Sequence, residues 1–171
     1  MSFLINASEA DDWSGTAFKA YRDHLESIKS HLPKAVYDFA VADWHYDGSK
    51  KESPHDAWIQ EIKIKEIAEG ETRISQIRTT QIEIILLGAY HDRLFKVTYE
   101  DVSSYFISSW QSSRGHGDWV IDEIGLSDAG LVTHEIKFWH DVFFKIECRN
   151  IIFQEQLTST PYETIWMEKA E

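Results

Sequence analysis

The sequence predicts an α+β fold in which two N-terminal helices pack on an antiparallel sheet of about six strands. Apolar residues recur every three or four positions before residue 45 and every second position after residue 56. In the last third, β-rich runs follow one another across connections that leave room only for hairpins. At 171 residues the chain has the length of one domain. We therefore expect a single domain over residues 1–171, with a helical front at about 10–45, the sheet at about 56–154 and a C-terminal tail at about 155–171.

Two helices are predicted in the N-terminal part. Ser8 or the pair Asp11–Asp12 can cap the start of the first helix. The apolar stripe of this helix consists of Trp13, Ala17, Tyr21, Leu25, Ile28 and Leu32. Pro33 ends the first helix or opens the next one, because proline is tolerated in a first turn. The second, shorter helix carries at helical spacing Val36, Phe39, Ala40 and Trp44.

The period changes to two after a polar loop. Residues 45–54 read HYDGSKKESP, a stretch without periodicity that indicates an exposed loop. Strands are then predicted around three groups of alternating apolar residues: Trp58, Ile62 and Ile64; Ile82, Ile84 and Leu86; and Phe95, Val97 and Tyr99. Within residues 103–117 the segment YFISSW fits either a strand or a helix, and QSSRGHG reads as a loop.

The three strands of the C-terminal hairpin meander are predicted at Trp119–Leu126, Leu131–Phe138 and Val142–Phe153. A three-residue loop at 139–141 places Ile136 opposite Phe144 and leaves one face of the second hairpin nearly all apolar. The opposite face then pairs Glu135 with Lys145, an attractive cross-strand contact.

The register of the first hairpin places polar residues on the apolar face. A four-residue loop at 127–130 sets Trp119 beside Phe138, Ile121 beside Ile136, and Glu123 beside His134. A carboxylate and an imidazole at one cross-strand position are either a mutually satisfied polar pair or part of a site. Since His116 and Asp118 stand close by in the sequence, these residues form the candidate catalytic cluster His116, Asp118, Glu123 and His134.

The sequence contains no motif for a metal or a cofactor, and we expect none to be required. The spacings of HExxH, of a calcium loop, of the P-loop and of G-x-G-x-x-G do not occur. Cys148 is the only cysteine and is predicted to point into the core, where a thiol is inert. Three His-Asp pairs resemble the pairs of metal phosphohydrolases, but those enzymes hold their ligands on helices, whereas at least two pairs here fall in turns or strand starts. The pairs are His55-Asp56, His91-Asp92 and His140-Asp141.

The charge of the chain favours a basic partner. A net charge of −12 opposes binding to nucleic acids or to anionic membranes. Between Gly115 and Ile136 the sequence has five acids and no Lys or Arg. The candidate partner-binding residues are Asp118, Trp119, Asp122 and Glu135. Alternation also places Trp119 on the core face, so burial is the alternative for this residue, and a solvated strand edge is the alternative for the acids.

Three segments carry a resemblance to known proteins. PHDAWI, GHGDWVIDEI and HEIKFWHDVFFKIEC look like motifs of small uncharacterised bacterial α+β proteins, and the general plan is similar to immunity proteins that neutralise secreted toxins. The resemblance covers about Leu25 to Phe153. It implies the fold and a bacterial origin more than a function. With the charge, we expect a non-enzymatic, immunity-like protein that binds a basic partner. The rival hypothesis is a small hydrolase or ligand-binding protein that uses His116, Asp118, Glu123 and His134. Without a secretory signal, an apolar span or a cysteine pair, we expect a cytoplasmic protein.

Overall fold

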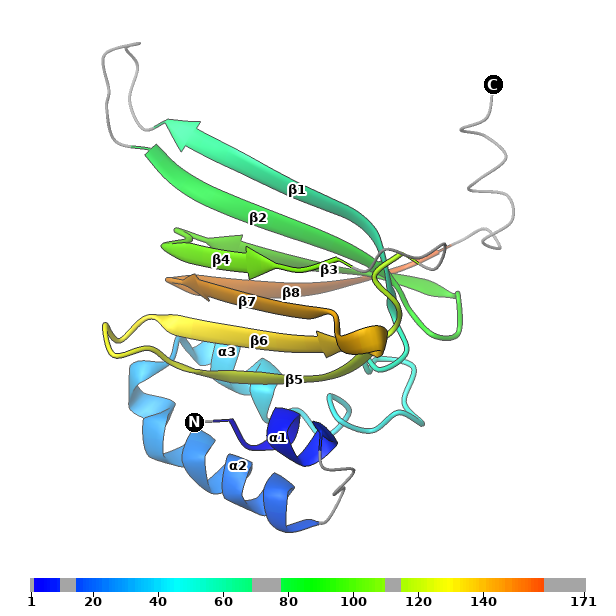
Figure 1. Ribbon diagram of the computed structural model, residues 1–171, viewed down its shortest axis with the longest axis horizontal. Helices are drawn as coiled ribbons and strands as arrows, with labels where there is room; N and C mark the ends of the chain where they lie inside the picture. Colours follow the sequence, from blue (N-terminus) through cyan, green and yellow to red (C-terminus); the bar gives the residue numbers. More distant parts are fainter. Residues whose placement is uncertain (1, 10–14, 69–77, 110–114, 159–171) are drawn as a thin grey trace.

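The computed structural model describes residues 2–9, 15–68, 78–109 and 115–158, and it confirms an α+β fold with antiparallel strands (Figure 1). The helices are α1 (Leu4–Glu9), α2 (Gly15–Ile28) and α3 (Lys34–Ala40), with 3-10 turns at Lys29–His31 and Trp139–Asp141. The strands are β1 (Trp58–Ala68), β2 (Arg78–Leu87), β3 (Arg93–Glu100), β4 (Ser104–Ile107), β5 (Trp119–Leu126), β6 (Val132–Phe138), β7 (Phe143–Cys148) and β8 (Asn150–Leu157).

The strands form two four-stranded sheets, where the sequence predicted one sheet of about six strands. The orders are β1-β2-β3-β8 in the first sheet and β4-β7-β6-β5 in the second. The difference arises because two extended segments bend from one sheet into the other, between β3 and β4 at Asp101, which has a positive φ of 50°, and between β7 and β8 at Arg149. Backbone hydrogen bonds from Ser103 to Glu147 and from Arg149 to Glu100 keep the two segments paired at the bend.

The helices pack beside β5 and β8 and confirm the predicted apolar stripes. Tyr21 and Leu25 of α2, and Val36, Phe39 and Ala40 of α3, are buried. Figure 1 shows all three helices gathered at the β5 side of the molecule. The short α1 escaped the prediction because six residues are too few to show a helical period. The predicted cap Asp11–Asp12 and the predicted stripe residue Trp13 lie outside the described residues. Among the described residues, no helix is both long and apolar enough to cross a bilayer.

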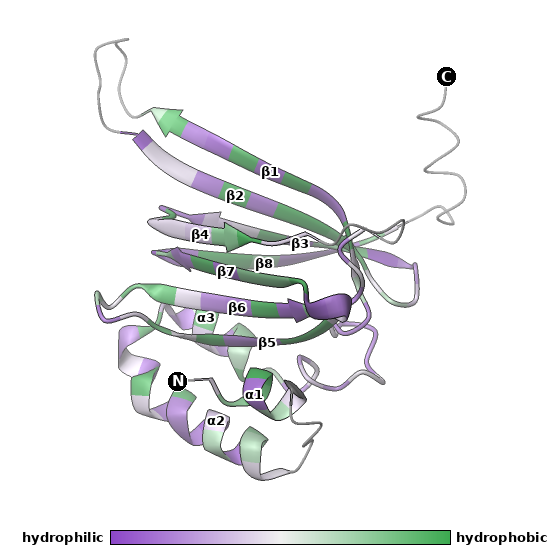
Figure 2. Ribbon diagram, in the orientation of Figure 1, coloured by the Kyte–Doolittle hydropathy of each residue, from purple (hydrophilic) through white to green (hydrophobic). Residues whose placement is uncertain are grey.

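Alternation along the strands produces one hydrophobic core. Polar and apolar residues alternate along most strands, as the colours of Figure 2 show. The buried strand residues of the first sheet include Ile82, Ile84, Leu86, Phe95, Val97 and Tyr99, as predicted. From the second sheet, the same cluster contains Ile136, Phe138, Phe144, Ile146 and Cys148. The segment YFISSW, which the sequence left open between helix and strand, begins with β4.

The C-terminal meander is confirmed, with one change of register. Ile136 pairs with Phe144, and Glu135 pairs with Lys145, as the three-residue loop predicts. In the first hairpin Trp119 pairs with Phe138, but a β-bulge at Val120 shifts the register, and the connection from Leu126 to Val132 is one residue longer than predicted. The predicted pairs Ile121 with Ile136 and Glu123 with His134 are therefore wrong. The segment predicted as a strand at Val142–Phe153 is divided at Arg149 and continues to Leu157, into the predicted tail.

Candidate functional site

The bulge in β5 places Asp122, and not the predicted Glu123, on the same face as His134. After the bulge, Asp122 pairs with Ile136 and Ile124 pairs with His134, so Asp122 shares the interior face with His134. Glu123 projects to the opposite face of the strand, because a shift of one residue turns every side chain over. There its carboxylate accepts the backbone N–H groups of Phe3 at 2.8 Å and Ile5 at 2.7 Å. Glu123 thus anchors the first turn of α1 to β5.

Asp122 is the centre of a buried polar network. Its carboxylate accepts hydrogen bonds from Nε2 of His45 at 2.9 and 3.0 Å, from Nε2 of His134 at 3.0 Å and from Nε1 of Trp119 at 3.2 Å. The far nitrogen of His134, Nδ1, lies 2.8 Å from the hydroxyl of Tyr99 on β3. The network therefore joins the second sheet, the first sheet and the loop after α3. Its histidines and Asp122 are no more than 1% exposed.

The hydrogen-bond inventory determines the charges in this network. Nδ1 of His45 lies 2.8 Å from the backbone oxygen of Phe39, which can only accept, so this nitrogen carries a proton. Nε2 of His45 donates to the ionised carboxylate of Asp122, so the ring is an imidazolium. His134 places Nε2 against Asp122 and Nδ1 against the hydroxyl of Tyr99, so both of its nitrogens have partners within the protein. Although burial alone would raise the pKa of Asp122, the charge of His45 and the hydrogen bonds from both histidines hold it well below its usual value.

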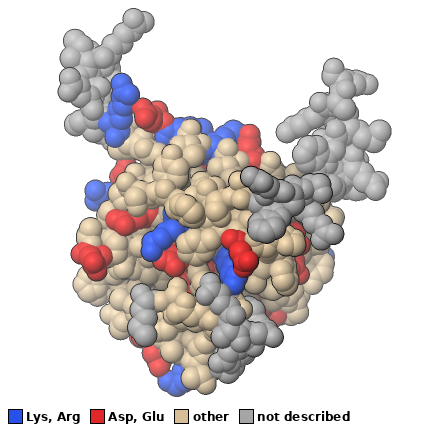
Figure 3. Space-filling model, viewed as in Figure 1, with Lys and Arg blue, Asp and Glu red and all other residues tan. Residues whose placement is uncertain are grey.

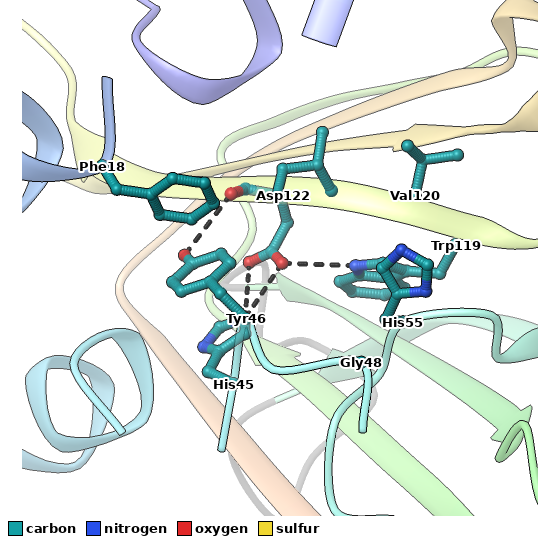
Figure 4. Close-up of a pocket in the computed structure, with 9 residues that line it drawn as sticks. Phe18, His45, Tyr46, Gly48, His55, Trp119, Val120 and Asp122 are labelled. Atoms are coloured by element: carbon teal, nitrogen blue, oxygen red, sulfur yellow. Dashed lines mark hydrogen bonds and ion pairs between the residues drawn. The ribbon is translucent and has the colours of Figure 1, made fainter. Parts of the chain in front are cut away.

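This network is closed and positions other groups rather than offering free ones. Both oxygens of Asp122 and both nitrogens of His45 are occupied by partners within the protein. Figure 4 shows His45, Tyr46, Phe18 and Trp119 around the carboxylate, at a cavity of 280 Å³. The cavity is lined mainly by rings, and its polar floor is already satisfied. The network fits a structural role, because it leaves no polar atom of Asp122 or His45 for a reactant.

A second and larger hollow lies where the N-terminal segment and α2 meet the outer face of β5, β6 and β7. It has a volume of 530 Å³ and is called the acidic groove here, after its four carboxylates, Glu123, Asp128, Glu135 and Glu147. Its lining also includes Ser2, Phe3, Tyr21, His24, Ile124, Gly125, Leu126, Ser127, Thr133 and Lys145. Gly125 contributes no side chain to the floor of the groove, and a Cβ at this position would come within 3.1 Å of the Thr133 hydroxyl oxygen.

The charges of the acidic groove are only partly compensated. Glu135 accepts a hydrogen bond from Lys145 at 2.6 Å and another from Ser2 at 3.3 Å. The carboxylates of Asp128 and Glu147 receive no hydrogen bond or ion pair from any other described side chain. Burial lowers the pKa of His24, which adds no positive charge near neutral pH. Two open carboxylates therefore face solvent in a hollow large enough for a side chain.

The four members of the predicted catalytic cluster are not brought together. Glu123 and His134 lie on opposite faces of the β5–β6 ribbon. The ring of His116 packs edge-on against Phe144, 5.6 Å between centroids. Asp118 lies at the start of β5, where burial and then the negative charge of Asp56 raise its pKa. The geometry gives no shared point at which these residues could act on a substrate.

Two of the predicted partner-binding residues are also corrected. Trp119 is 1% exposed and packs against Phe138, so the core alternative holds for this ring. Asp122 is buried within the histidine network. Glu135 lies in the acidic groove, while Asp118 lies outside its lining. Of the predicted partner-binding residues, only Glu135 is on the surface of this groove.

Sequence reasoning missed His45 and Glu147. His45 stands in the polar stretch predicted to be exposed, yet it is 1% exposed and contacts a residue 77 positions away. No local pattern marks such a residue. Glu147 could have been placed beside Glu135, because the confirmed register and the alternation of β7 put both on the outer face.

In the described ranges, no group of three or more His, Cys, Asp or Glu residues could hold a metal ion. The His-Asp dipeptides occur in turns instead of on helices. Asp56, His91, His140 and Asp141 all have positive φ angles between 57° and 62°, a region that Asp, Asn and His enter more readily than most residues. Cys148 is buried, and burial raises the pKa of its thiol to about 12, so it is no nucleophile.

Comparisons with protein-family models, with curated proteins and with solved structures give no significant match to this chain, so the site is interpreted from its own geometry.

Proposed function

We propose that this protein binds a basic partner protein through the acidic groove, in the manner of an immunity protein that neutralises a toxin. The observation that carries the proposal is the pair of open carboxylates, Asp128 and Glu147, beside Glu135 in a hollow of 530 Å³. A Lys or Arg side chain of the partner that entered the groove would give these acids the charge-assisted hydrogen bonds that they lack within the chain.

The charge of the whole chain supports the same class of partner. A net charge of −12 attracts a cationic protein and repels nucleic acids and anionic membranes. On the face in Figure 3, charged side chains of both signs are scattered among uncharged ones, without one broad acidic patch. We therefore propose that the acidic groove makes the specific contacts with the partner, and that the net charge attracts the partner over longer distances. We propose that the two proteins meet in the cytoplasm.

The test uses synthetic ten-residue peptides rich in lysine or arginine, with acidic peptides of the same length as negative probes. Binding of the basic peptides is measured at low and at physiological salt. The groove variant is Asp128→Asn/Glu135→Gln/Glu147→Gln. The matched control, Asp38→Asn/Asp43→Asn/Asp101→Asn, removes the same charge from positions outside the groove lining. We expect the groove variant to weaken binding about tenfold and the control to have a much smaller effect.

The two sets of variants separate a site from a general charge effect. Equal losses in both would mean that net charge alone attracts the peptides, and the groove would drop out of the proposal. Unchanged affinity in both variants would show that none of these acids contributes to peptide binding. Added salt should slow association, because screening shortens the range of steering.

A further inference from the structure

The free edges of the two sheets are protected unequally. On β5, the Tyr21 hydroxyl accepts the N–H of Ile124 at 2.7 Å and donates to its backbone oxygen at 3.2 Å. The hydroxyl of Tyr46 lies 3.4 Å from the backbone oxygen of Asp122 and occupies the next position of the same edge. α3 packs against β8, the edge strand of the other sheet. The edge of β5 is therefore covered by two tyrosine hydroxyls, and α3 contacts β8.

β1 is a long edge strand that is left open. One side of it pairs with β2, and on its other side the described residues provide only the bridge between Trp58 and Asp118. Beyond that bridge the strand runs on to Ala68, and Figure 1 shows β1 and β2 extending away from the second sheet. Ile64 is 48% exposed although it pairs with Ile82, which is fully buried. An edge strand with an unpaired backbone and an exposed isoleucine can pair with a strand of another chain.

We propose that β1 pairs in antiparallel register with β1 of a second copy of the chain, centred on Lys63. In this register Ile62 faces Ile64 of the second copy, and Glu61 faces Lys65 of the second copy. The two-fold symmetry repeats both contacts. Ile62 and Ile64 of both copies then share one face, and Glu61 and Lys65 pair on the other, the combination that stabilises cross-strand pairs.

Registers shifted by one residue are less favourable. Such a shift places Ile64 opposite Lys63 or Glu61 and mixes the two faces. In the proposed register the two copies of Lys63 face each other, but each is already paired with Glu61 of its own chain at 2.7 Å. The first sheets of the two copies would join into one continuous sheet. This association surface is separate from the acidic groove, so the two proposals stand or fall independently.

Charge reversal at two positions of β1 tests this register. Sedimentation velocity over micromolar to millimolar concentrations should show a reversible monomer–dimer equilibrium for the wild type. Lys65→Glu places two acids opposite each other and should raise the dimer dissociation constant about tenfold, and Glu61→Lys should do the same with two lysines. The double variant Glu61→Lys/Lys65→Glu restores opposite charges across the interface and should recover the wild-type dimer.

The double variant also separates the interface from effects within one chain. Lys65 is paired with Glu83 of its own chain at 2.9 Å, and the double variant does not restore that contact. Recovery of the dimer therefore reports only on pairing between copies. A wild type that stays monomeric over the whole range, or a dimer that neither single reversal weakens, would overturn the proposal.

Discussion

Asp122 holds the largest concentration of buried polar contacts in the described structure. Three side chains donate to its carboxylate, and one of them, His45, brings a compensating positive charge. Burying an ion costs free energy unless its partners replace the hydrogen bonds to water. Here both carboxylate oxygens of Asp122 accept hydrogen bonds. The gain is positional, because the same carboxylate fixes the rings of His45, His134 and Trp119 from three separate segments.

Replacing this carboxylate should destabilise the protein strongly. In Asp122→Asn the imidazolium of His45 loses its counter-charge, and the new amide N–H groups face the N–H groups of the histidines. We expect a loss of about 3 to 5 kcal/mol in the free energy of unfolding, measured by chemical denaturation. The control Asp128→Asn changes an exposed acid in the connection between β5 and β6 and should change the free energy of unfolding by no more than about 0.5 kcal/mol. Similar small losses in both would show that the network is dispensable.

The same carboxylate should give a pH dependence on the acid side. Because the folded pKa of Asp122 is depressed, its stabilising contribution is complete above the unfolded value of 3.8 and is lost as the pH falls from there toward the folded pKa. Denaturation midpoints of the wild type should therefore fall over this range. In Asp122→Asn the fall should be smaller. An equal acid dependence of both proteins would assign it to other carboxylates.

At the scale of single elements, the free edge of β5 at Ile124 is hydrogen-bonded by the hydroxyl of Tyr21. Tyr21→Phe leaves both the N–H and the backbone oxygen of Ile124 without this partner in a buried place. The expected cost is about 1 to 3 kcal/mol in unfolding free energy. Tyr37→Phe is the matched control, since its hydroxyl contacts Glu26 at the surface and should cost little. Equal costs would mean that the hydroxyl of Tyr21 is replaced by water without penalty.

The second hairpin of the meander makes a further prediction at this scale. Ile136 and Phe144 are paired and fully buried, so Ile136→Ala or Phe144→Ala should cost about 2 to 5 kcal/mol. Lys137 alternates to the outer face, and Lys137→Ala should be nearly neutral. Urea denaturation of the three variants measures this, and a loss at Lys137 as large as the other two would contradict the assignment of faces.

Across the whole molecule, the five acids between Gly115 and Ile136 lie in different environments. Asp122 is neutralised inside, and Glu123 anchors α1 from the wall of the acidic groove. Asp128 and Glu135 line the same groove, while Asp118 lies outside its lining. Acids that are neighbours in the chain therefore have separate physical roles.

The whole molecule should also fold without a metal. With one cysteine, the described part of the chain has no group of three or more His, Cys, Asp or Glu residues that could hold a metal ion. Dialysis against a chelator should leave the melting temperature unchanged. A marked decrease that zinc reverses would reveal a structural metal site.

Local patterns were sufficient for most of the longer elements and for half of the meander. The stripe of Tyr21 and Leu25, the alternation of Ile82 to Leu86 and the three-residue loop after Phe138 each act between near neighbours, so the sequence alone predicts helix, strand and register there. The division into two sheets was hidden, because the bends at Asp101 and Arg149 depend on how distant strands pack.

The candidate site was decided by tertiary structure. A single extra residue at Val120 turned β5 over, exchanged Glu123 for Asp122 beside His134, and dissolved the predicted catalytic cluster. His45 entered the network from 77 positions away. A bulge has no signature in alternation, and long-range hydrogen bonds have none in spacing. Composition could therefore indicate an acidic surface, but only the packing of strands and helices determined which acids are buried and which are exposed.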